Sequence, residues 1–178
     1  MGQRLNIEIR KDNKVLANAY YHWSGHTSSA LGLTKKILDS KFLNMSSISD
    51  KVKAVRMLEV TGAGLTKNEF NEEFTTPKYK QALDRNKGLI AISQEGISET
   101  QKGEEARVEI HIDTKMLNLK LYWDLDDIDK DTIIEKVETN YFNVSFDNFE
   151  KVNSEIYNLI KNKTYHFKYQ SNKFGFIE

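Results

Sequence analysis

The sequence predicts an α+β domain in which helices cover one face of a mixed or antiparallel β-sheet. Three observations support this fold class: apolar and polar residues alternate near the N-terminus, helical periodicity follows, and the alternation returns from Gly88 onward. The 178 residues, of which 39% are hydrophobic, suit one domain with its own core. We therefore expect residues 1–178 to form a single α+β domain.

A β-hairpin is expected at the start of the chain. Leu5, Ile7 and Ile9 alternate with polar residues, and residues 11–14 supply a polar turn. Residues 15–23 then have the pattern of the returning strand. This hairpin would form the first two strands of the sheet.

The two faces of the returning strand differ in chemistry. Because side chains alternate along a strand, Tyr21 and Trp23 are expected in the core, whereas Tyr20 and His22 point to the opposite face. We expect Tyr20, His22 and the Ser24–Ser29 turn to be the exposed part of this segment. They are the first candidates for a functional surface.

Helical patterns fill the next part of the chain. The Ser24–Ser29 turn offers N-cap side chains for a helix with Ala30, Leu33 and Ile37 on one face. A later helix is expected to start at Pro77, because proline is favoured at the first helical position, and to stop before Gly88.

Between these two lies another expected helix, which begins at Ser49 or Asp50 and ends at Gly62. Its apolar positions recur at helical spacing. The residues that this helix is expected to carry are Val52, Val55, Leu58 and Glu59.

Strands are expected again after Gly88. They cover residues 89–92, 107–113, 117–122, 141–146, 165–169 and 174–177. The second and third of these meet at Thr114–Lys115 and are expected to pair as an antiparallel hairpin. A further helix is expected to begin at Asp147, with Glu150 completing a capping-box-like start.

The composition excludes several classes of protein. The absence of cysteine excludes disulfides, thiolate zinc sites and cysteine nucleophiles, and it suits a reducing cytoplasm. The 26 basic and 26 acidic residues cancel, which argues against a protein that coats DNA through excess positive charge. No apolar run approaches the roughly 20 residues of a membrane span, and residues 1–4 lead into a strand pattern without a signal peptide.

The turn before the first helix is a candidate ligand site. Helix N-termini attract phosphate or carboxylate because their first N–H groups are unpaired and lie at the positive end of the helix dipole. The residues expected to bind such a group are Tyr20, Ser24, Gly25, Thr27 and Ser28. Tyr20 could stack on a base or ring beside the anion. The simpler alternative is that one of these hydroxyls caps the helix.

His22 and His26 are the candidate catalytic residues if the protein is an enzyme. They are four residues apart, but a strand and a turn separate them, and a zinc site would need further ligands from His111, His166 or carboxylates. No metal site is therefore expected. A carboxylate could pair with His22 as acid and base, and the candidates are Glu95, Glu99, Glu104 and Glu105.

An acidic run follows the strand that ends near Tyr122. Its candidate partner-binding residues are Asp124, Asp126, Asp127 and Asp129, which could imitate nucleic-acid phosphates toward a basic protein. An EF-hand loop ending at Glu138 is the alternative, but Thr132 occupies the position at which that loop needs glycine. The start of a helix explains the run better than a calcium site does.

Two short segments carry a resemblance to a known group of proteins. Residues 4–9 and the sequence Ala19 to His26 resemble small bacterial and phage proteins with a Tyr-x-His-Trp-Asp-Gly-Tyr signature between an N-terminal hairpin and a helix. This chain has Ser24 where Asp is usual and His26 where Tyr is usual, which puts any role of that Asp in doubt. The resemblance implies a phage or prophage setting in a bacterial cytoplasm.

That setting leads to the first functional expectation. Small proteins of this kind often block host defence, so we expect an anti-CRISPR-like inhibitor that binds a bacterial defence nuclease or its guide complex. The host partner would be a protein or a protein–RNA complex. The alternatives are a nuclease or other phosphoesterase that uses His22 and His26, and a nucleotide-binding protein. The sequence assigns neither a cofactor nor an oligomeric state.

Overall fold

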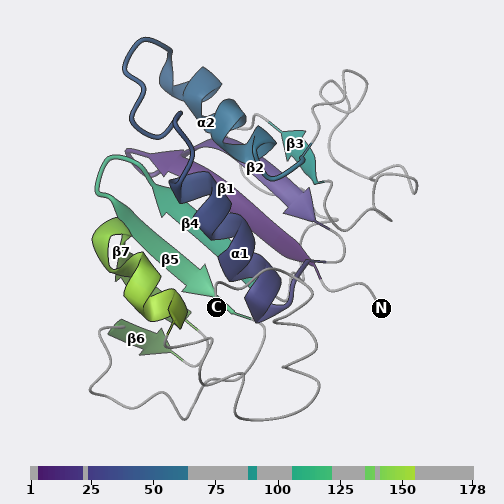
Figure 1. Ribbon diagram of the computed structural model, residues 1–178, viewed down its shortest axis with the longest axis vertical. Helices are drawn as coiled ribbons and strands as arrows, with labels where there is room; N and C mark the ends of the chain where they lie inside the picture. Colours follow the sequence, from purple (N-terminus) through teal and green to yellow (C-terminus); the bar gives the residue numbers. More distant parts are fainter. Residues whose placement is uncertain are drawn as a thin grey trace.

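The computed structural model describes residues 4–21, 24–63, 88–91, 106–121, 135–138 and 141–154. These residues form a seven-stranded sheet in the order β3-β2-β1-β4-β5-β7-β6 (Figure 1). The strands are β1 (Leu5–Lys11), β2 (Lys14–Tyr21), β3 (Leu89–Ala91), β4 (Ala106–His111), β5 (Met116–Lys120), β6 (Glu135–Glu138) and β7 (Tyr141–Ser145). The helices are α1 (Thr27–Leu38), α2 (Asp50–Glu59) and the 3₁₀ turn η2 (Phe146–Asn148), which leads into the helical residues 149–154.

The sheet is mixed, and β1 is an interior strand next to the middle strand, β4. β1 pairs antiparallel with β2 and parallel with β4, whereas the remaining neighbours all pair antiparallel. In this register Ile7 lies opposite Ala19 on β2 and Val108 on β4. The described helices lie over one face of this sheet, which confirms the predicted α+β class (Figure 1).

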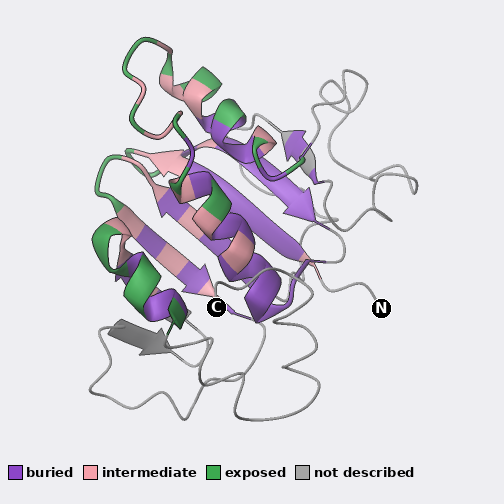
Figure 2. Ribbon diagram, in the orientation of Figure 1, coloured by how far each residue is buried: buried purple, intermediate pink, exposed green. Residues whose placement is uncertain are grey.

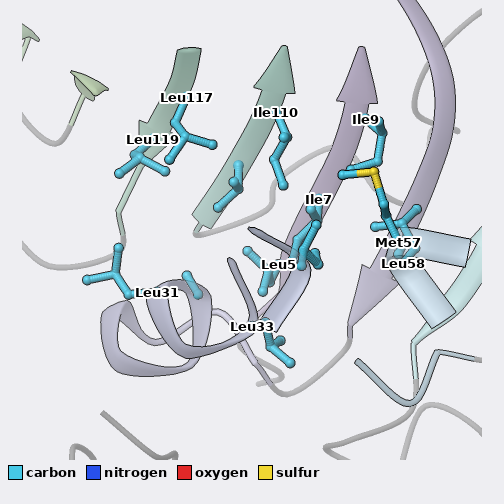
Figure 3. Close-up of a cluster of buried hydrophobic side chains, with 14 of the residues drawn as sticks. Leu5, Ile7, Ile9, Leu31, Leu33, Met57, Leu58, Ile110, Leu117 and Leu119 are labelled. Carbon is cyan, nitrogen blue, oxygen red and sulfur yellow. The ribbon is translucent and has the colours of Figure 1, made fainter. Parts of the chain in front are cut away.

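The hydrophobic core lies between that face and the helices. Leu31 of α1 and Met57 and Leu58 of α2 point toward the apolar side chains of the central strands (Figure 3), and Leu33 of α1 belongs to the same buried cluster. Each such side chain contributes about 1.5–3 kcal/mol when it is removed from water. Figure 2 shows buried residues along most of β1 and much of α1, and buried residues alternating with intermediate ones along β4.

The predicted hairpin turn is confirmed. Asp12 and Asn13 both have positive φ angles, 50° and 61°, which match the two-residue turns that follow the twist of a hairpin. The backbone N–H of Asp12 also donates to Asp113 Oδ2 at 3.0 Å. This bond ties the hairpin turn to the loop that follows β4.

Helix α2 begins as predicted but ends earlier than predicted. The Ser49 hydroxyl accepts from the backbone N–H of Val52 at 3.4 Å, so Ser49 is the N-cap. The helix ends at Glu59, and Gly62, with φ 87°, lies in the turn beyond it. The buried residues of the helix are Ala54, Val55, Met57 and Leu58, and Val52 lies outside this stripe and is 46% exposed.

Strand β6 was not predicted. The acidic run was expected to open a helix or, in the alternative, to form a calcium loop ending at Glu138, yet residues 135–138 pair antiparallel with β7.

The predicted helix from Pro77 and the predicted strands 165–169 and 174–177 lie outside the described residues. The helix expected at Asp147 is preceded by η2, and Glu150 binds Lys35 Nζ of α1.

A hydrogen bond from Tyr21 links the end of β2 to the turn that follows α2. Its hydroxyl bonds to Thr61 Oγ1, and Thr61 Oγ1 donates to the Leu58 carbonyl at 2.7 Å. Because Thr61 gives its proton to Leu58, the Tyr21 hydroxyl acts as the donor. Burial raises the pKa of Tyr21 well above its ordinary value. The phenol therefore remains neutral and keeps this bond at physiological pH.

Gly88 leaves the space that the Tyr21 ring occupies. A Cβ at position 88 would lie 2.6–2.9 Å from three ring atoms of Tyr21. We expect Gly88→Ala to lower the free energy of unfolding by about 1–3 kcal/mol, measured by chemical denaturation, because the buried ring cannot move aside. In a Tyr21→Leu background the same change should cost less. An equal cost in both backgrounds would contradict this explanation.

Candidate functional site

The start of α1 is built by the short connection from β2. Tyr21 ends the strand, and α1 begins six residues later at Thr27. His26 is the N-cap: its backbone is extended, its carbonyl accepts from Ala30 N–H at 2.9 Å, and its side chain makes no capping bond. The first turn of α1 also contains no acidic residue. The positive end of the helix dipole is thus not compensated by a local carboxylate.

Three hydroxyl side chains lie in that first turn. Thr27, Ser28 and Ser29 are all buried, and their hydroxyl oxygens have no hydrogen-bond partner within the part of the chain that the structure describes. A buried hydroxyl without a partner costs about 1–3 kcal/mol on protein scales. The backbone N–H groups of the same turn have no partner inside the helix either, since the first four N–H groups of any helix lack one. Donors are therefore concentrated here without acceptors.

The expected exposure of this segment was wrong. Tyr20 is 4% exposed, and Ser24, Gly25, Thr27 and Ser28 are also buried. The alternation of side chains along β2 correctly places Tyr20 and Tyr21 on opposite faces of the sheet. The face that carries Tyr20 is nevertheless buried as well. Ser24, Gly25, Thr27 and Ser28 lie in the connection from β2 and the first turn of α1, whereas Tyr20 lies on the other face of the sheet.

The candidate catalytic pair cannot be assembled from the described residues. His26 lies buried at the N-cap of α1, whereas His22 falls outside the described residues. The same holds for its four candidate carboxylate partners, Glu95, Glu99, Glu104 and Glu105, and for the candidate partner-binding residues Asp124, Asp126, Asp127 and Asp129.

The described residues contain neither a metal-ligand cluster nor a membrane-spanning helix. Among these residues, no group of three or more His, Cys, Asp or Glu side chains could hold a metal ion. No helix in the same part of the chain is long and apolar enough to cross a membrane.

The second face of the sheet carries a polar row that the sequence prediction missed. One side chain from each of five neighbouring strands lies in register across the sheet, and we call this set the polar row. Its members are Asn18 (β2), Glu8 (β1), Glu109 (β4), Asn118 (β5) and Asn143 (β7). The alternation of β1 and β4 was the available signal, since it already placed Glu8 and Glu109 opposite the core residues. Their alignment in one row depends on the strand order.

The middle of this row is a connected network. Glu109 Oε2 accepts from Asn118 Nδ2 at 3.1 Å and lies 3.3 Å from His111 Nε2. Asn118 Nδ2 also lies 3.1 Å from His111 Nε2. Arg10 Nη1 lies 2.5 Å from Glu8 Oε2 and 3.7 Å from Glu109 Oε1, so one guanidinium serves both carboxylates. This pairing offsets part of the cost of burying Glu8.

Comparisons with known proteins add nothing to this geometry. A scan against protein-family models and searches of curated proteins and of solved structures found no match to this chain.

The first-turn hydroxyls can be tested by stability. Thr27→Val keeps the side-chain shape and removes a hydroxyl that has no partner, so the free energy of unfolding should stay level or rise by up to about 1 kcal/mol. Thr34 is the matched control in the same helix, because its buried hydroxyl donates to the Ala30 carbonyl at 2.7 Å. Thr34→Val should lower stability by about 1 kcal/mol. Chemical denaturation of both variants makes the comparison, and an equal loss would mean that Thr27 is partnered.

Proposed function

We propose that the protein binds the phosphate group of a small molecule at the N-terminus of α1. The observation that carries this proposal is the set of buried first-turn hydroxyls of Thr27, Ser28 and Ser29, which have no partner among the described residues. An anion would accept hydrogen bonds from these hydroxyls and from the backbone N–H groups of the same turn. It would also lie at the positive end of the helix dipole.

Phosphate fits this arrangement better than carboxylate does. A phosphate group presents three strong acceptor oxygens, whereas a carboxylate presents two. Three hydroxyls and several N–H groups within one turn can be satisfied together only by a ligand with many acceptor positions. The absence of an acidic side chain from the first turn removes the repulsion that a doubly charged group would otherwise meet. A nucleotide is the natural candidate among phosphate-bearing ligands.

Thermal denaturation with inorganic phosphate and pyrophosphate tests the proposal. A ligand that binds the folded state raises the melting temperature with its concentration, so a saturable rise is expected at constant ionic strength set with chloride. Nucleotides should follow the same behaviour if the phosphate is their main anchor. An unchanged melting temperature for every phosphate compound would refute the proposal.

Variants distinguish binding from a general salt effect. Phosphate also stabilises folded proteins by exclusion from their surface, and this effect is common to all variants. Thr27→Val and Ser28→Ala should remove the saturable part of the shift, whereas Thr34→Val should retain it. If all three variants respond like the wild type, the phosphate acts on the solvent and not on this site.

The inhibitor and nuclease hypotheses stay predictions. The acidic residues 124–129 and His22, on which they depend, lie outside the described residues. Inhibition and pull-down assays with bacterial defence nucleases test the first, and loss of nucleic-acid cleavage in His22→Ala tests the second. Phosphate binding at α1 is compatible with either hypothesis.

A further inference from the structure

The two ends of the polar row differ in how well their side chains are partnered. Glu109, His111 and Asn118 bond to one another, as described above. At the other end, Asn18 lies next to Glu8 in register on the neighbouring strand. Asn18 is 1% exposed, and neither its Nδ2 nor its Oδ1 has a hydrogen-bond partner in the described part of the chain. The structure therefore holds a buried carboxamide with one donor group and one acceptor group unused.

Glu8 has unused capacity beside it. Its side chain is 2% exposed, and Arg10 Nη1 lies 2.5 Å from its Oε2 atom. A carboxylate has about four acceptor positions on its two oxygens. Asn18 and Glu8 together can therefore supply a hydrogen-bond donor and several acceptors within one small area of the sheet.

We propose that the Asn18–Glu8 end of the polar row is a second binding site, and that it takes the edge of a guanine-type nucleobase. Guanine presents two neighbouring donors, N1–H and the N2 amino group, which suit the Glu8 carboxylate, and an O6 acceptor that suits Asn18 Nδ2. Adenine would satisfy Asn18 through its N6 and N7 atoms but would present fewer donors to Glu8. A cationic ligand gains less, because Arg10 already compensates Glu8.

An aromatic side chain lies beside this end of the polar row. Tyr20 lies one position along β2 from the polar row on the same face, since Tyr20 and Asn18 are two residues apart on one strand. Aromatic rings next to such groups commonly provide stacking for bases. This site goes beyond the proposed phosphate site, because it needs neither the helix terminus nor a phosphate and lies on the face of the sheet opposite α1.

Isothermal titration with guanosine, which has no phosphate, tests this site separately from the phosphate site. Wild-type protein should bind guanosine, and inosine, which lacks the N2 amino group, should bind at least about tenfold more weakly. Asn18→Leu keeps the side-chain volume and removes both hydrogen-bonding groups. It should weaken guanosine binding at least about tenfold and leave the response to inorganic phosphate unchanged.

Two further variants keep the test decisive. Asn18→Asp removes the donor and keeps the shape, so it should also lose guanosine binding. Asn118→Leu is the matched control in the same row: it should lower the melting temperature, because its amide is bonded, and retain guanosine binding. The melting temperature of Asn18→Leu should stay level or rise.

Three results would overturn the proposal. The first is an absence of guanosine binding to the wild type. The second is equal guanosine binding by the wild type and Asn18→Leu. The third is a melting temperature of Asn18→Leu as low as that of Asn118→Leu, which would mean that protein groups or ordered water already satisfy the amide. Failure of phosphate binding alone would leave the guanosine results intact.

Discussion

The burial of β1 on both faces is the constraint on which the rest of this structure depends. Ile7 on one face and Asn6 and Glu8 on the other are all at most 2% exposed. An apolar side chain satisfies such a position by packing, whereas a polar one needs hydrogen bonds to replace the water that it loses. The apolar face meets this requirement through α1 and α2. The polar face meets it only in part, and this difference between the faces defines where chemistry can occur.

The end of β2 lies next to both candidate sites. Tyr20 and Tyr21 are neighbours in the chain and point to opposite faces of the sheet. Tyr21 is held by Thr61 and by the space above Gly88, so the strand end has a fixed position. The chain then reaches α1 within six residues. The first turn of α1 and the polar face beside Tyr20 are consequently positioned by the same packed tyrosine.

The sequence was sufficient to predict which side chains share a face of a strand. It was not sufficient to predict whether that face is buried or which strands lie beside it. Alternation in β1, β2, β4 and β5 correctly identified the core side chains, and the same alternation separated Tyr20 from Tyr21. Alternation says which residues share a face and does not say whether that face is covered, so the exposure of Tyr20 was wrong. The polar row depends on strand order, which requires the parallel pairing of β1 with β4 across a long stretch of chain. Residues 135–138 form a strand through pairing with β7, although two of these four residues are glutamates.

Groups without partners are informative here because the same elements contain satisfied groups of the same kind. Thr34 lies two turns after Thr27 in α1 and donates to a backbone carbonyl, and Asn118 shares a row with Asn18 and bonds to Glu109. The helix and the sheet can therefore satisfy a buried hydroxyl or carboxamide where only stability is at issue. Valine at position 27 or leucine at position 18 would fill the same volumes without the desolvation cost. Local departures from good packing chemistry concentrate at functional sites, and this is the reason for proposing that ligands complete the polar groups at the α1 start and beside Glu8.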